Sequence, residues 1–156
     1  MPVIIRDEIK EGYVTTFGIK HDELPPDTNG RVTDSFFEIV NRYLAGNISV
    51  VIEAAFQHKV WEPRIPKIRD LADPCIVLCA ADDAVTSRRP LERGVENPDR
   101  EFYHGDHRAV HYKKTGEILT PAAYEPPSFD LLTIEVTTDE GYDPPIDDIL
   151  KKIGSA

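Results

Sequence analysis

Residues 48–63 contain the feature that most constrains the fold, a short β-branched run that ends in an acid. Val50, Val51 and Ile52 predict a strand buried on both faces of a parallel sheet, and Glu53 follows them directly. Open α/β sheets bind their ligands at the ends of such strands. Glu53 is therefore either a binding-site residue at the rim of a sheet or a solvated side chain at the end of a core strand.

Segments with the pattern of strands and segments with the pattern of helices alternate along the rest of the chain. Further strands are expected at residues 3–5, 75–79 and 131–136. Helices are expected at 6–12, from Thr33 or Asp34 to about 45, from about Pro63 to 72, at 82–93 with a kink at Pro90, and at 145–153. Most of 13–31 and of 96–127 is expected to be loop. This alternation predicts an α/β fold with a mostly parallel sheet, in one domain over residues 1–156.

Composition excludes several classes of partner. The chain has 18 Lys and Arg against 28 Asp and Glu, and a net charge of −10 opposes nonspecific binding to nucleic acid or to an anionic membrane. No apolar run approaches the ~20 residues of a membrane span, and the N-terminus lacks the apolar core of a signal peptide. Cys75 and Cys79 would lie ~13 Å apart on one strand, too far for a disulfide. Buried free thiols and a cytoplasmic location are expected.

Four segments, taken in order, resemble small P-loop kinases of the group that includes chloramphenicol phosphotransferase, zeta toxins and polynucleotide 5′-kinases. These segments are residues 6–12, residues 50–56, the arginines between 88 and 100, and residues 136–138. The resemblance covers about 3–106 and 131–153. It implies a P-loop kinase-like sheet flanked by helices and an ATP-dependent phosphotransferase that acts on the hydroxyl of a small-molecule acceptor.

The resemblance also implies roles for residues at the ends of two strands. Asp7 matches the Asp of a D-x-x-R motif that orients or deprotonates the acceptor hydroxyl in these kinases, which makes it the candidate catalytic base. Lys10 stands where Arg is usual. It keeps the positive charge for substrate binding but lacks the planar guanidinium that grips a phosphate with two hydrogen bonds. Glu53 is expected near the acceptor or near a water molecule on Mg²⁺.

Arginines of the segment 82–93 match the lid of this family. Arg88 and Arg93 are the candidate catalytic arginines and Arg89 a candidate substrate-binding residue, because cations there would neutralise charge on a transferring phosphate. The alternative is a solvated basic helix face, which Pro90 favours because a broken helix would misdirect these side chains.

The phosphate loop of this family has no counterpart in the sequence. The motif G-x-x-x-x-G-K-[ST] cradles phosphates with backbone amides, and none of the nine glycines is followed by Lys-Ser or Lys-Thr. An incomplete gene model is expected, lacking the first strand, the phosphate loop and the first helix. ATP and Mg²⁺ are then expected only for a complete form. The alternative function is a non-catalytic binding or interaction domain derived from such a kinase.

The absent strand lies centrally in the family's sheet, between the strands that match Val50 and Ile76. Those two strands should either pair directly or leave a gap that exposes apolar surface.

The segment 104–111 contains a metal-like cluster. His107 and His111 would share one face of a helix, and Asp106 could add an oxygen ligand. The segment is polar and expected to be loop, however, and short His clusters are common false positives. The resemblance instead implies contacts with the lid or the substrate, so no metal site is expected.

Overall fold

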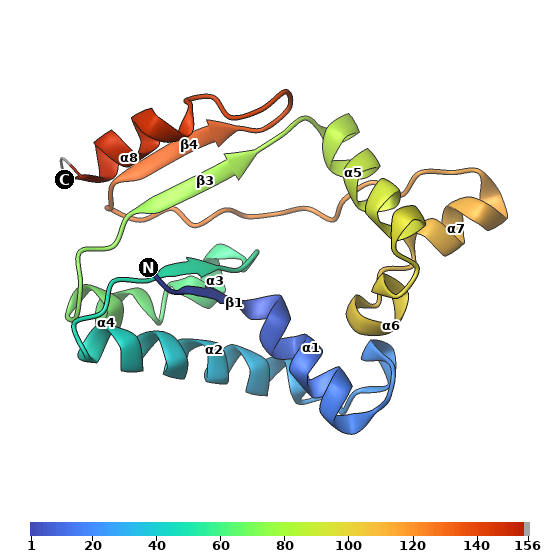
Figure 1. Ribbon diagram of the computed structural model, residues 1–156, viewed down its shortest axis with the longest axis horizontal. Helices are drawn as coiled ribbons and strands as arrows, with labels where there is room; N and C mark the ends of the chain where they lie inside the picture. The colour runs from blue at the N-terminus through green and yellow to red at the C-terminus, as the bar shows by residue number, and fades with distance from the viewer. Residues whose placement is uncertain (155–156) are drawn as a thin grey trace. The chain divides into compact units, whose positions relative to one another are not determined.

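Two parallel two-stranded sheets form the framework of the chain, one in each of its two structural units (Figure 1). The computed structural model describes residues 1–154. Residues 1–55 and 90–119 form the first unit, and residues 56–89 with those from 120 onward form the second. Short parallel strands flanked by helices confirm the predicted α/β class. The expectation of one domain stays a prediction.

In the first unit, β1 (Val3–Ile5) pairs in parallel with β2 (Val51–Glu53). The register sets Val3 opposite Val51 and Ile5 opposite Glu53. The helices of this unit are α1 (Arg6–Phe17), the 3-10 helix η1 (His21–Glu23), α2 (Thr28–Ala45), the second half of α5 (Asp83–Glu96), α6 (Arg100–His104) and α7 (Arg108–Thr115). Since α1 begins at the residue after β1, its first turn lies at the carboxyl end of the sheet.

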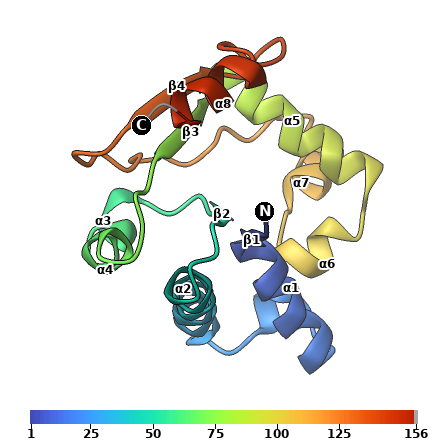
Figure 2. The ribbon, with the colours of Figure 1, turned by 60° about the vertical axis from the view of Figure 1, so that its left-hand side comes forward.

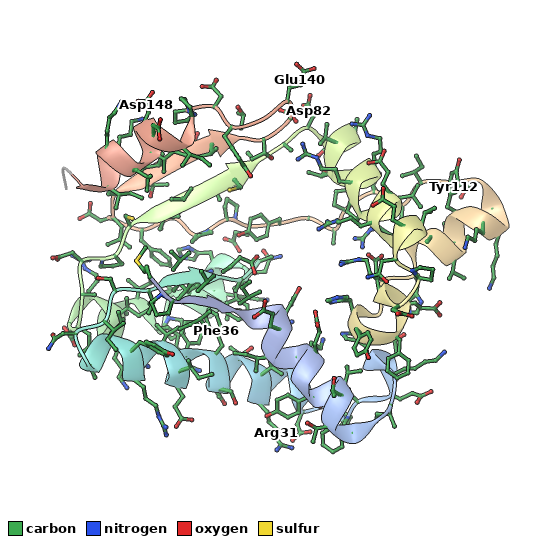
Figure 3. All side chains as sticks on the ribbon, viewed as in Figure 1. Arg31, Phe36, Asp82, Tyr112, Glu140 and Asp148 are labelled. Atoms are coloured by element: carbon green, nitrogen blue, oxygen red, sulfur yellow. The ribbon has the colours of Figure 1, made fainter. Side chains whose placement is uncertain are left out.

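The apolar face of α2 supplies most of the core of the first unit. Its buried apolar side chains recur at helical spacing, at Val32, Phe36, Phe37, Val40 and Leu44. Phe36 meets Phe37 edge to face with ring centroids 5.1 Å apart, and it lies on the side of α2 that faces the strands (Figure 3). Figure 2 shows α1 beside α2 near this sheet. Truncation of Phe36 to Ala should cost ~3–5 kcal/mol of stability, because its side chain is fully buried.

In the second unit, β3 (Ile76–Ala80) pairs in parallel with β4 (Thr133–Thr137). The unit also contains α3 (His58–Trp61), α4 (Ile65–Arg69), the first half of α5 (Asp83–Glu96) and α8 (Ile146–Gly154). Ile134 and Val136 on one face of β4 form a buried cluster with Ile149 of α8, and Figure 1 shows α8 running along β4.

The strands are less buried than the sequence predicts. Val51 is 44% exposed and Val77 is 42% exposed. The expectation of buried thiols is wrong for Cys79, which is exposed, while Cys75 is half-buried and both are free. Each sheet has two strands, so it offers too small a surface for helices to cover both faces as in a large parallel sheet. The pairing partner of β2 is β1 and that of β3 is β4, each pair forming a sheet within its own unit.

Several helix boundaries also differ from the sequence predictions. The first helix continues past residue 12 to Phe17, α2 begins at Thr28 rather than at Thr33 or Asp34, and α6 and α7 replace part of the expected loop 96–127. The helix expected from about Pro63 to 72 is the shorter α4, and the short helix α3 precedes it. The next helix, α5, continues through Pro90 to Glu96.

Candidate functional site

Asp7 and Glu53 lie at the same end of the first sheet. Ile5 pairs with Glu53, and Asp7 follows Ile5 by two residues in the first turn of α1. An acid is favoured there because the helix dipole and the unpaired amides stabilise negative charge. The side chain of Asp7 is 62% exposed, so its carboxylate is accessible to a ligand. The two carboxylates that the sequence singled out are therefore brought together by strand pairing.

The charges at this end of the sheet influence one another. The pKa of Glu53 is raised above 4.5, first because burial penalises its charged form and second because the negative charge of Asp7 opposes its ionisation. The pKa of Lys10 is lowered from 10.5, first by burial and second by the positive charge of Arg6, while Asp7 and Asp22 act in the opposite direction. Lys10 thus lies within the electrostatic field of Asp7, and its role in substrate binding stays a prediction.

Arg6 is a member of this site that the sequence reading did not single out. Its Nη1 donates to Oδ1 of Asp7 at 3.0 Å, and its Nη2 donates to Oδ1 of Asn29 in the first turn of α2 at 3.0 Å. The side chain is only 18% exposed. Its place before Asp7 is visible in the sequence, but the contact with α2 depends on the tertiary fold.

The arginines expected over a transferring phosphate are divided between the two units. Arg93 is an exposed residue of the first unit, and Arg88 is an exposed residue of the second. Arg89 is half-buried and donates to the backbone carbonyls of Thr138 and Asp139 and to the hydroxyl of Thr138. The roles of Arg88, Arg89 and Arg93 toward a substrate therefore stay predictions.

Arg89 holds a loop that is also tied to the end of β3. The amide of Asp82 donates to Oδ1 of Asp139 at 2.8 Å, and the amide of Thr138 donates to the carbonyl of Ala80 at 2.8 Å. Figure 3 shows Asp82 and Glu140 close together where β3 and β4 end. Arg89 thus has a structural task within the second unit.

The histidines of the metal-like cluster pair with different acids. Nε2 of His104 lies 3.2 Å from Oε1 of Glu11, and Nε2 of His107 lies 2.6 Å from Oδ2 of Asp22. Nδ1 of His21 lies 2.9 Å from the other oxygen of Asp22, and these two hydrogen bonds are the main reason that the pKa of Asp22 is lowered.

Asp106 is engaged by arginines rather than by the histidines. It is buried, with Oδ1 at 3.1 Å from Nη1 of Arg108 and Oδ2 at 3.6 Å from Nε of Arg100. Within residues 1–154, no group of three or more His, Cys, Asp or Glu side chains is arranged to hold a metal ion. The cluster instead joins α1, η1 and α6 within the first unit.

Comparison with known proteins shows a likeness to a solved structure. No protein-family model and no curated protein matches the chain. Among solved structures, it is similar to a protein from Chloroflexus aurantiacus J-10-fl described as a "putative kinase", with a TM-score of 0.68 and 17% identity over 99% of this chain and 83% of that chain. The two proteins share a fold. At this identity the likeness concerns the fold alone. Within the described residues, no helix is long and apolar enough to cross a membrane.

Proposed function

We propose that this chain forms the acceptor side of an ATP-dependent phosphotransferase that acts on the hydroxyl of a small molecule. The observation that carries the proposal is the strand register that sets Ile5 opposite Glu53 and so brings Asp7 and Glu53 to one end of the sheet. A ligand at the carboxyl end of parallel strands would meet both carboxylates. The fold shared with the Chloroflexus aurantiacus protein supports the same class.

Asp7 acts as the general base on the acceptor side. Its exposed carboxylate accepts the proton of the acceptor hydroxyl, whose oxygen then attacks the γ-phosphorus of ATP while the bond from that phosphorus to the departing ADP oxygen breaks. Glu53, whose ionisation burial and Asp7 both disfavour, binds a second hydroxyl of the acceptor. The cation of Lys10 holds the acceptor near Asp7 by charge rather than by a bidentate fork.

The proposal assigns the binding of ATP and Mg²⁺ to no residue of the described chain. None of the nine glycines begins a phosphate loop, and the described residues offer no group of three or more metal-ligating side chains. ATP and Mg²⁺ would thus be bound by a segment that carries G-x-x-x-x-G-K-[ST], with Arg88, Arg89 and Arg93 as its lid.

A specific observation favours a second candidate, a non-catalytic binding domain. Arg89, expected over the transferring phosphate, instead donates to the carbonyls of Thr138 and Asp139. Such a domain would keep Asp7 and Glu53 at the end of the first sheet without nucleotide chemistry.

The upstream genomic sequence and an activity assay separate the two candidates. An in-frame phosphate-loop motif ahead of Met1 should yield a longer protein that releases ADP from ATP only when hydroxyl acceptors are added. The panel should contain small-molecule alcohols and 5′-hydroxyl oligonucleotides. Absence of that motif, or a longer protein inert toward the whole panel, would favour the binding domain.

A further inference from the structure

We propose that Arg6 is a positioning residue that fixes the carboxylate of Asp7 in one orientation. Its meaning for catalysis depends on the function proposed above, but the positioning itself is a property of the chain. Arg6 contacts Asp7 through one arm of its guanidinium and Asn29 through the other, each at 3.0 Å. The planar fork makes these two hydrogen bonds geometrically dependent on each other.

The contact between Arg6 and Asp7 is not a default of helix geometry. Neighbouring residues on an α-helix project in different directions, and side chains at i and i+1 do not normally face each other. Here Asn29, at the start of another helix, holds the far arm of the guanidinium. The buried face of α2 keeps Asn29 in place, since Val32 and Phe36 in the next turns are fully buried.

Burial explains why Arg6 can act as a fixed support while Asp7 remains reachable. The side chain of Arg6 is 18% exposed and that of Asp7 is 62% exposed. A mostly buried guanidinium needs charge-assisted hydrogen bonds to offset its lost hydration, and the Asp7 carboxylate supplies one. The arginine of this ion pair is therefore mostly buried, unlike that of a fully exposed surface pair.

The arrangement assigns different tasks to the two oxygens of Asp7. Oδ1 accepts the hydrogen bond from Arg6. Among residues 1–154, the structure gives Oδ2 no hydrogen-bond donor, so this oxygen is available for the acceptor's proton. Arg6 thus fixes which oxygen acts as base and in which direction it presents its lone pairs.

A purely structural role for Arg6, joining α1 to α2, makes a different prediction. In that case the loss of Arg6 would lower stability but leave the side chain of Asp7 in one rotamer. The measurement must therefore report on the side chain of Asp7 rather than on stability.

Three-bond NMR couplings from the Asp7 carboxyl carbon to its backbone nitrogen and carbonyl carbon report its χ1 rotamer in the 156-residue chain. The wild-type couplings should indicate one rotamer. In Arg6→Gln and in Asn29→Ala, both couplings should move toward the values of a rotamer average. In Arg6→Lys they should fall between the wild-type values and the averaged ones. Arg42→Gln is the matched control, because Arg42 is an exposed arginine of α2 that pairs with Glu38 and should leave Asp7 unchanged.

A single Asp7 rotamer in a folded Arg6→Gln protein would overturn the proposal. Should Arg6→Gln fail to fold, Asn29→Ala decides, because it keeps Arg6 and removes the hydrogen bond from Nη2 on which the proposed orientation depends. Averaged couplings support the proposal and unchanged couplings refute it. The coupling measurement uses no ATP, so it does not depend on the proposed function. A longer protein without phosphotransferase activity would contradict the proposed function but would leave these couplings unchanged.

Discussion

Ile5 lies directly opposite Glu53 in the parallel pairing of β1 with β2, and this places the charge of Asp7 close enough to oppose the ionisation of Glu53. Burial is the larger cause of the raised pKa of Glu53 and Asp7 is the second. Asp7→Asn should therefore lower the pKa of Glu53 without returning it to 4.5. Carbon-detected NMR titration of the Glu53 carboxyl measures this, with Glu8→Gln in the same helical turn as control. An unchanged pKa of Glu53 in Asp7→Asn would show that the charge of Asp7 does not affect the ionisation of Glu53.

The raised pKa of Glu53 also predicts a pH-dependent stability. A carboxyl that binds its proton more tightly in the folded state contributes stability that is complete below its unfolded pKa and is lost as pH rises through its folded pKa. Glu53→Gln should therefore unfold at a higher temperature than wild type at neutral pH and at the same temperature well below pH 4.5. Thermal melts across this range provide the measurement, with the acidic melts as internal control. A Glu53→Gln protein that is less stable at neutral pH would refute it.

The contribution of Asp22 to stability should depend on pH in the opposite direction to that of Glu53. Hydrogen bonds from His21 and then from His107 lower its pKa below 3.8, so its contribution to stability is present above that value and is lost as pH falls through the folded pKa. Asp22→Asn should destabilise the chain at pH 5–6 by about 0.5 kcal/mol, since the group is exposed, and the difference should vanish in stronger acid. Asp27→Asn, which removes an exposed acid that makes no side-chain cap on α2, is the matched control in urea titrations. A difference that persists in strong acid would show that charge is not its cause.

Arg89 should matter for the stability of the second unit whatever its role toward a substrate. It donates to two backbone carbonyls and one hydroxyl from a half-buried position, so Arg89→Ala should cost ~1.5–3 kcal/mol. Arg89→Lys should recover part of this loss, because an ammonium cannot reach all three oxygens with a planar fork. Lys67→Ala, an exposed change on α4, should stay within ~0.5 kcal/mol of wild type in the same denaturant titration. Equal stability of Arg89→Ala and wild type would show that these hydrogen bonds contribute little.

The sequence predicted the strands well because a β-branched run carries its own signal. Residues 50–52 and 131–136 coincide closely with β2 and β4. Proximity of Asp7 and Glu53 could also be predicted, since parallel strands bring their carboxyl ends together. The number of strands per sheet depends on long-range pairing, which is why the exposure of Val51 and Cys79 could not be read from local pattern.

Three of the helices that sequence reading shortened or missed, α1, α6 and α7, share one overlooked signal. Gly18, Gly105 and Gly116 each end a helix with a positive φ, and glycine is the residue that adopts this conformation most readily. The two helices α6 and α7 bury few apolar side chains, so periodicity could not reveal them. They are held instead by polar pairs such as those of Asp106 with Arg100 and Arg108, which form only in the folded chain. The contact of Arg6 with Asn29 was missed for the same reason.

The most direct test of Asp7 as the base is phosphate transfer by a form of the protein that carries a phosphate loop, compared between Asp7→Asn and Glu8→Gln. Both changes remove one exposed acid from the first turn of α1, so they alter the helix terminus alike. Single-turnover transfer from ATP to the acceptor should fall ~100-fold or more in Asp7→Asn and stay near wild type in Glu8→Gln, with ATP affinity unchanged in both. Transfer at the wild-type rate by Asp7→Asn, or an equal loss of ATP affinity and transfer, would contradict the account.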